Sequence, residues 1–271
     1  MDEAVMPRVT RRMVSVDGSE RPVLRGGAGT TLVLIHGGWG GAALHYSRVF
    51  EALAETFDVV APELPGFLES DARVPRGVDG DAEWVAALLD SLGVEKAIVV
   101  GNSFGASVAL AFASRHRSRC LGVVVVNGFA MPPTPAWLAF LARARFARAL
   151  LREFIVRTAF RPARIAEAFH DPRNVPPELH ATIAAGARAQ VDRLVDTFLL
   201  GGSPIDLAGV PTRILWGADD QLRDSRVEVA PRVARELGVS APRTIAGAGH
   251  CPQLEQPEAF VREIRAFASG L

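Results

Sequence analysis

The sequence predicts an α/β fold in which a mainly parallel sheet is covered by helices on both faces. Short β-rich runs alternate with helical patterns along residues 13–126, the alternation stops between 131 and 206, and it resumes at 212. The apolar runs 31–35 and 121–126 have the continuous Val/Ile/Leu character of strands that are buried on both faces. One sheet domain with a helical insertion therefore accounts for the whole length.

The predicted elements alternate in an order that places the carboxyl ends of the parallel strands at one edge of the sheet. The two opening strands are joined by the turn Asp17-Gly18-Ser19. The predicted strands are 13–16, 22–25, 31–35, 57–61, 97–100, 121–126, 212–216 and 242–245. The predicted helices are 46–55, 81–92, 103–115, 225–237 and 257–269.

The insertion divides the chain into a core and a cap. Residues 1–130 and 207–271 form the expected core, and residues 131–206 form the expected helical cap. The cap segment is rich in Ala, Arg, Leu and Phe at helical spacing and is interrupted by prolines, which break helices. The chain contains no internal repeat, so nothing in the sequence indicates a second sheet domain.

The overall composition excludes several function classes. Thirty basic and thirty acidic residues cancel, so no net charge favours nucleic acid or an anionic membrane as partner. The N-terminus has no apolar stretch typical of a signal peptide, and no run is long enough to span a bilayer. Cys120 and Cys251 lie far apart without metal-site or disulfide spacing. We expect a cytoplasmic monomer or homodimer that acts on a small molecule without a metal or other cofactor.

The segment Gly101-Asn102-Ser103-Phe104-Gly105 is a candidate nucleophile turn. It follows a predicted strand and begins a predicted helix, and a serine at such a sharp turn needs small residues two positions away on either side. The start of the helix adds N–H donors beside the hydroxyl. We interpret Ser103 as the nucleophile; the alternative is a serine that only caps the helix.

A serine hydroxyl needs a base to attack a carbonyl near neutral pH. Among six histidines, His250 lies between the last predicted strand and the last helix, at the same sheet edge as Ser103. A carboxylate must orient this base, and Asp219 and Asp220 follow the preceding strand. The order Ser, Asp, His along the chain is typical of this arrangement. We favour Asp220, with Asp219 as the alternative.

Acyl transfer also requires N–H donors that face the developing oxyanion. The N–H of Phe104, directly after the nucleophile, is one candidate. The second is expected from the glycine run after His36, where Gly38 is our first choice and Gly37 the alternative. A plain flexible turn is the competing interpretation of this run.

With these residues identified, the chain resembles the α/β-hydrolase superfamily along essentially its full length. The resemblance rests on His36-Gly37-Gly38, the segment 62–67, the serine turn, Trp216-Gly217-Ala218-Asp219-Asp220 and the segment 249–255. It implies an eight-stranded sheet with a helical cap between strands six and seven. It also favours Asp220, because the family's acid usually stands three residues after the glycine of the Trp-Gly pair.

Within that superfamily, the Gly-Asn-Ser turn and the His-Gly-Gly run are similar to those of hydrolases that cleave carbon–carbon bonds in dienoic ring-fission products. These enzymes commonly have tryptophan after the catalytic histidine, where this chain has Cys251, and their cap arginine has no clear counterpart here. Our leading expectation is a carboxylesterase, and a carbon–carbon hydrolase is the second. A perhydrolase or haloperoxidase-like enzyme and a non-catalytic ligand receptor are further alternatives.

Several residues are candidates for substrate binding. In the carbon–carbon hydrolase interpretation Asn102 contacts substrate, although a role in supporting the turn is an equal alternative. Aromatic side chains could line an apolar pocket, although helical spacing is also typical of packing inside the cap. The candidates are Asn102, Trp39, Trp137, Phe140 and Phe154. An arginine of the cap that binds a substrate carboxylate is a further alternative.

Overall fold

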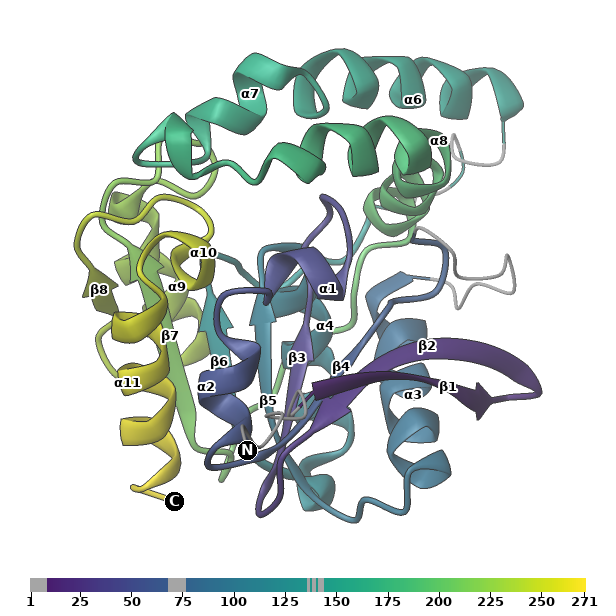
Figure 1. Cartoon of the computed structure of the whole chain (residues 1–271). Coiled ribbons are helices and arrows are strands. Elements are labelled where there is room, and N and C mark those ends of the chain that lie inside the picture. The colour runs from purple at the N-terminus through teal and green to yellow at the C-terminus, as the bar shows by residue number, and fades with distance from the viewer. Residues whose placement is uncertain (1–8, 68–76, 136, 138–139, 141–143) are drawn as a thin grey trace, which may run out of the picture.

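A sheet of eight strands runs through the centre of the described part of the chain (Figure 1). The computed structural model describes residues 9–67, 77–135, 137, 140 and 144–271. The strands are β1 (Val9–Val16), β2 (Ser19–Gly26), β3 (Thr31–Ile35), β4 (Asp58–Pro62), β5 (Ala97–Asn102), β6 (Cys120–Val126), β7 (Thr212–Gly217) and β8 (Arg243–Ile245). Their order in the sheet is β1-β2-β4-β3-β5-β6-β7-β8. The opening hairpin is antiparallel and β3 to β8 are parallel, which confirms the predicted fold class.

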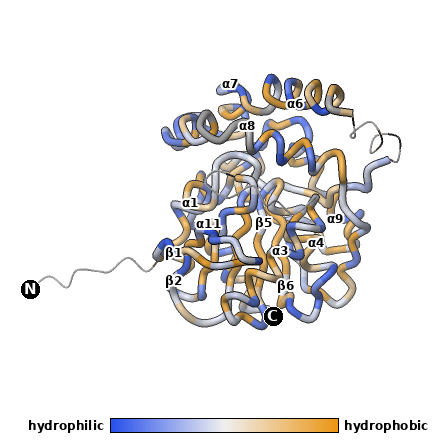
Figure 2. The backbone as a smooth tube through the Cα atoms, turned by 90° about the vertical axis from the view of Figure 1, so that its right-hand side faces the viewer, coloured by the Kyte–Doolittle hydropathy of each residue, from blue (hydrophilic) through white to orange (hydrophobic). Residues whose placement is uncertain are grey.

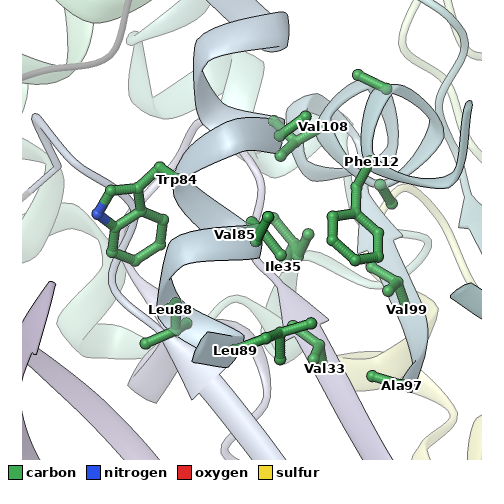
Figure 3. Close-up of a cluster of buried hydrophobic side chains, with 14 of the residues drawn as sticks. Val33, Ile35, Trp84, Val85, Leu88, Leu89, Ala97, Val99, Val108 and Phe112 are labelled. Carbon is green, nitrogen blue, oxygen red and sulfur yellow. The ribbon is translucent and has the colours of Figure 1, made fainter. Parts of the chain in front are cut away.

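The parallel strands are buried because helices cover both of their faces. One face packs against α3 (Gly77–Ser91), α4 (Phe104–Arg115) and α9 (Ala230–Leu237). Figure 3 shows this layer at β3 and β5, where side chains of α3 and α4 interlock with those of the two strands. Its labelled residues are Val33, Ile35, Trp84, Val85, Leu88, Leu89, Ala97, Val99, Val108 and Phe112.

The opposite face packs against α1 (Ala42–His45), α2 (Phe50–Ala54) and α11 (Pro257–Ala268). Leu32 and Leu34 point to this face, while Val33 and Ile35 of the same strand point to the other. This alternation follows from the two-residue repeat of a strand, and because both sets of side chains are apolar, β3 must lie inside the molecule.

Among the described residues between β6 and β7, the helices α6 (Arg145–Ala159), α7 (Pro162–Glu167) and α8 (Pro177–Leu200) cover the carboxyl edge of the sheet in both views (Figures 1 and 2). We call them the cap helices. Ile155 of α6 packs against Val191, Val195 and Leu199 of α8 in a small core of their own. A buried ion pair between Asp81 of α3 and Arg193 of α8 joins this layer to the rest of the molecule.

Three predicted helices differ by several residues from those observed. The predicted helix 81–92 begins earlier, at Gly77 of α3. Of the predicted helix 46–55 only α2 is helical: residues 46–49 form a turn, in which the buried Tyr46 donates a hydrogen bond from its hydroxyl to the carbonyl of Ile35 over 2.7 Å, and α1 lies before the predicted start. The predicted helix 225–237 begins later, with a 3₁₀ turn at Val227–Val229 followed by α9. Ser225 lies before this turn, and its hydroxyl donates a hydrogen bond to Asp220 in the site described below.

Candidate active site

Ser103 occupies a strained turn between β5 and α4. Its backbone has φ 54° and ψ −116°, a region that L-residues rarely adopt and that costs about 1–3 kcal/mol. A Cβ at Gly101 would lie 2.1 Å from the carbonyl oxygen of Gly105, and a Cβ at Gly105 would lie 2.2 Å from that of Ile35. Glycine is therefore required on both sides, and the turn presents the Ser103 side chain to a cavity at the carboxyl edge of the sheet.

His250 lies on the loop between β8 and α10 (Pro252–Glu255), and its ring lines the same cavity as Ser103. Its Nδ1 atom is 2.7 Å from Asp220 Oδ2. Because one ring nitrogen faces this carboxylate, Nε2 is the nitrogen that remains for a proton transfer. The structure thus brings the predicted base and the predicted acid into direct contact.

The two neighbouring aspartates have different environments. The Asp220 side chain is fully buried at His250, whereas the Asp219 side chain is 39% exposed. Asp219 Oδ2 accepts a hydrogen bond from the N–H of Gly247 over 3.0 Å and lies 3.4 Å from His170 Nδ1. Asp220 therefore has the geometry of the acid, and Asp219 supports the loop that precedes His250.

The Asp220 carboxylate accepts hydrogen bonds at both oxygens. Oδ1 accepts from the N–H of Leu222 over 2.9 Å, and Oδ2 accepts from Asn127 Nδ2 over 2.8 Å and from Ser225 Oγ over 2.7 Å. Burial opposes ionisation, but the charge of His250 and the hydrogen bonds from His250, Ser225 and Leu222 together hold the pKa of Asp220 below its usual value. The carboxylate is therefore ionised when it orients the imidazole.

The glycine run after β3 is held by His36. This histidine is fully buried, accepts a hydrogen bond at Nε2 from the N–H of Leu64 over 3.0 Å, and contacts the carbonyl oxygen of Gly37 at 2.8 Å through Nδ1. Burial lowers the pKa of His36, so the ring is neutral and can donate at Nδ1 while it accepts at Nε2. Gly37, Gly38 and Phe104 all line the cavity beside Ser103, as expected of oxyanion-binding positions.

A second neutral histidine also lines the cavity. The Nε2 atom of His45 and the Cβ atom of Ser103 lie 2.8 Å and 3.3 Å from the same point, where a Cβ at Gly37 would stand. Burial, with the charges of His36 and His250, lowers the pKa of His45 to about 3, although a hydrogen bond to Asn102 opposes the shift. His45 is therefore an uncharged hydrogen-bonding group near the nucleophile.

The cavity has a volume of about 780 Å³ and lies between the sheet edge and the cap helices. Its lining is mainly apolar, and among the described lining residues the two cationic side chains are Arg164 and Arg223. Trp39 and Phe154 are part of the wall. Trp137 and Phe140 are 65% and 69% exposed and lie outside the described lining. Aromatic spacing alone does not distinguish the inner from the outer surface of a cap.

Asn102 connects the segments that carry Ser103 and His250. Its side chain is fully buried, and Nδ2 donates to the carbonyl oxygens of Val126 and His250 over 3.2 Å and 3.0 Å. Its Oδ1 atom accepts from Gln253 Nε2 over 3.2 Å. The amide thus connects the nucleophile turn to the histidine loop, which agrees with the supporting role considered above, and it is not among the described cavity-lining residues.

The histidine loop also contacts the segment after α7. The N–H of His250 donates to the carbonyl oxygen of Ala168 over 2.6 Å, and a Cβ at Gly249 would lie 2.3 Å from that oxygen. Glu255 accepts from the N–H of Gly249 over 2.6 Å and from the N–H of Asp171 over 3.3 Å. The segment after α7 and the loop that carries His250 therefore meet directly at His250.

The described residues contain no group of three or more histidine, cysteine or carboxylate side chains placed to hold a metal ion. No helix in the same part of the chain combines the length and hydrophobicity needed to cross a bilayer.

Comparison with known proteins identifies the family. A model of the alpha/beta hydrolase family matches residues 32–263, which include the nucleophile turn, both aspartates and His250. The chain belongs to the alpha/beta hydrolase family.

Relatives of this alpha/beta hydrolase extend the match to nearly the full chain. It is 29% identical to 2-hydroxy-6-oxo-2,4-heptadienoate hydrolase of Pseudomonas putida, over 96% of each chain. It is also 29% identical to 2-hydroxymuconate semialdehyde hydrolase of a Pseudomonas species, over 96% of this chain and 94% of that one. Among solved structures, a thermophilic esterase of Thermogutta terrifontis has a TM-score of 0.64 and 26% identity over 96% and 98% of the two chains. The named relatives of this alpha/beta hydrolase are therefore hydrolases.

Sequence reasoning gave no role to three side chains of this alpha/beta hydrolase site. These are Ser225, which falls in the predicted helix 225–237, and Asn127 and His45. The position of Asn127 at the end of β6 was a usable signal, because strand ends meet at this edge. Ser225 and His45 gave none, because their contacts depend on loop conformations.

Proposed function

We propose that this chain is a serine hydrolase that cleaves a carbon–carbon bond in a 2-hydroxy-6-oxo-dienoate. The observation that carries this proposal is the full-length similarity to two dienoate and semialdehyde hydrolases, together with the Gly-Asn-Ser turn. A 6-oxo-dienoate contains no ester or amide, so its hydrolysis requires cleavage next to the ketone. This proposal replaces the carboxylesterase expectation as the leading one.

In the proposed reaction, Nε2 of His250 takes the hydroxyl proton as Ser103 Oγ adds to the ketone carbon of the substrate. The N–H groups of Phe104 and Gly38 stabilise the oxyanion, with Gly37 as the alternative to Gly38. The bond from this carbon to the dienoate then breaks. The substrate reacts as its keto tautomer, in which the proton of the C2 hydroxyl has moved to C5, so the electron pair of the broken C5–C6 bond is delocalised onto the C2 carbonyl oxygen. That oxygen takes the proton from His250, and the first product is a 2-hydroxy-dienoate. Water, deprotonated by His250, finally releases the acyl group from Ser103 as a carboxylic acid.

The described lining of the cavity contains two arginines, Arg164 and Arg223, and one acidic residue, Asp224, and the arginines are the groups that could bind a carboxylated substrate. Arg223 comes from the loop that carries Asp220 and forms no ion pair with a described residue, whereas Arg164 pairs with Glu167 over 3.1 Å. A guanidinium at the wall of an apolar cavity can bind a carboxylate in a fixed orientation. We assign Arg223, with Arg164, to the carboxylate end of the substrate, and Trp39 and Phe154 to its apolar part.

We also propose that residues 131–206 act as a cap on a core formed by 1–130 and 207–271. An isolated antiparallel bridge between Pro133 and Gly201 brings the two ends of this segment together. The residues that line the cavity come from both parts, with Ser103 and His250 below and Leu151 and Leu194 above. In this arrangement the core supplies the reaction and the cap selects the substrate.

Carboxylic-ester hydrolysis is the second candidate. The similarity to the Thermogutta terrifontis esterase favours it, and the same serine, histidine and aspartate would suffice. An ester has its own leaving group and needs no dienoate carboxylate, so the two arginines would then have no role in binding. This difference separates the two candidates by experiment.

The test compares 2-hydroxy-6-oxo-2,4-heptadienoate with p-nitrophenyl acetate as substrates of the purified full chain. We expect kcat/KM to be at least about 100-fold higher for the dienoate, and Ser103→Ala to abolish turnover of both. A higher value for the ester would establish the second candidate. Failure of a fluorophosphonate to label Ser103, with no turnover of either substrate, would indicate a ligand receptor.

A further inference from the structure

A hydroxyl group lies between the two members of the Asp220–His250 pair. Ser225 Oγ is 2.7 Å from Asp220 Oδ2 and 3.0 Å from His250 Nδ1, while Nδ1 is 2.7 Å from the same Oδ2. The three atoms therefore form a closed triangle of hydrogen-bonding contacts. Asp220 and His250 alone suffice to activate Ser103 in the proposed chemistry, so the hydroxyl of Ser225 must be explained separately.

The protons in this triangle have one consistent arrangement. An ionised carboxylate can only accept hydrogen bonds, so the hydroxyl of Ser225 donates to Asp220. The lone pairs of Ser225 Oγ then face Nδ1 of His250, whose N–H is shared between Ser225 and Asp220. This arrangement places the proton on Nδ1 and leaves Nε2 free of it, which is the tautomer that a base toward Ser103 requires.

The surrounding loop fixes the backbone of Ser225, and the contacts with Asp220 and His250 hold its hydroxyl. Trp216 Nε1 donates to the carbonyl oxygen of Ser225 over 2.6 Å, and the N–H of Ser225 donates to the carbonyl oxygen of Leu222 over 2.9 Å. Trp216 is fully buried in β7, so the sheet itself holds Ser225. Ser225 is also buried, although it lines the cavity. A hydroxyl with so little freedom can restrain its neighbours.

We propose that Ser225 is a positioning residue, whose hydroxyl limits rotation of the His250 ring and keeps its proton on Nδ1 during turnover. This inference rests on the proposed roles of Ser103, Asp220 and His250. Asn127 differs from Ser225. Its amide nitrogen donates to Asp220 Oδ2 and its amide oxygen accepts from the N–H of Gly217, so it orients the carboxylate alone. Ser225 contacts both the acid and the base.

The experiment replaces Ser225 with Ala, Thr and Val in the full chain. Thr and Val have nearly the same shape, but only Thr keeps a hydroxyl. Turnover of the better substrate and the rate at which a fluorophosphonate labels Ser103 are measured, with thermal midpoints as a check on folding. Ser114→Ala is the matched control, because Ser114 Oγ accepts a hydrogen bond from the N–H of Asp206 away from the cavity.

We expect Ser225→Ala and Ser225→Val to lower kcat and the labelling rate about 10- to 100-fold while KM changes less than about twofold, and Ser225→Thr to restore most of both rates. Wild-type rates in the Ala variant, or equal losses in folded Thr and Val variants, would overturn the inference. If Thr and Val fail to fold, the proton NMR signal of His250 Nδ1–H decides: a shift in the Ala variant supports the inference and an unchanged signal overturns it. If Ser103→Ala is still labelled and active, the proposed function fails instead.

Discussion

The sheet edge and the cap helices are held together in different ways. At the sheet edge, buried groups such as Asp220 and Asn102 have a specific partner for each polar atom. The cap helices have one buried ion pair among the described residues, Asp81–Arg193, but they also have exposed pairs such as Arg152–Asp192, and Phe146 is 74% exposed. Exposed ion pairs contribute only about 0–1 kcal/mol each. The comparison teaches that the side chains proposed to react are fixed by buried hydrogen bonds, while the cap helices that line the cavity are held partly by weak exposed contacts.

The largest effect should come from the acid at the sheet edge. Asp220→Asn should lower kcat about 10³- to 10⁴-fold, because an amide donates to His250 Nδ1 and favours the wrong tautomer. Asp219→Asn is the matched control, since its amide oxygen can still accept from Gly247, and kcat should stay within about twofold. Steady-state kinetics on both folded variants tests this. A larger loss of kcat in Asp219→Asn than in Asp220→Asn would make Asp219 the acid.

The buried contact between core and cap should make stability depend on pH. Burial raises the pKa of Asp81 from 3.8 to about 6, although the charge and hydrogen bond of Arg193 oppose the shift. The folded state therefore binds this proton more tightly than the unfolded state, and the resulting stability is present below pH 3.8 and is lost as pH rises through about 6. Asp81→Asn cannot titrate, so wild type should gain about 1–3 kcal/mol relative to it between pH 7.5 and 4.5.

Urea unfolding of wild type and Asp81→Asn at both pH values measures this difference. A difference that stays constant, or that favours wild type at the higher pH, would show that attraction to Arg193 outweighs burial at this contact between α3 and α8.

The arginines of the cavity should affect binding more than catalysis. Arg223→Gln should raise KM for the dienoate about tenfold and leave KM for p-nitrophenyl acetate within about twofold, because only the dienoate has a carboxylate. Arg164→Gln should have the smaller effect, since Arg164 is already paired with Glu167. Arg226→Gln, on the same loop but outside the described lining, is the control. An equal rise for both substrates would contradict carboxylate binding.

The smallest effect should come from His45. Because burial and the charges of His36 and His250 lower its pKa to about 3, His45 is neutral throughout the working range. His45→Gln should therefore leave the inflections of the pH–rate profile between pH 5 and 9 unchanged, whatever its effect on KM. If an inflection of the pH–rate profile moves, His45 titrates in this range, and the sheet edge contains a second pH-dependent group.

Much of the core could be predicted because its signals are local. Continuous apolar runs indicate buried strands, the glycines around Ser103 reflect a steric requirement, and the order of Ser103, Asp220 and His250 follows the strand ends. The non-helical turn at residues 46–49 could not be predicted, because it involves a long-range hydrogen bond from Tyr46 to Ile35. Tertiary contacts override helical spacing at such points.

The cap was harder to predict for a related reason. Trp137 and Phe154 share the same apolar character and sequence region, yet only Phe154 is part of the described cavity wall. Which side of a cap helix faces the substrate depends on how the helix sits on the core, and the sequence contains no local signal for that. Ser225 illustrates the same limit inside the core, since its role depends on a loop that folds back to His250.

The hydrogen bond from His250 to the carbonyl of Ala168 has a consequence for engineering. A chimera that exchanges the helical segment for one from a relative would also exchange the neighbour of the catalytic loop, where Gly249 leaves no space for a bulkier junction. Grafts that retain residues 168–171 should preserve the loop, whereas complete replacements should need compensating changes at Gly249 or Glu255. In this chain, exchange of the helical segment is therefore constrained at the backbone contact between His250 and Ala168.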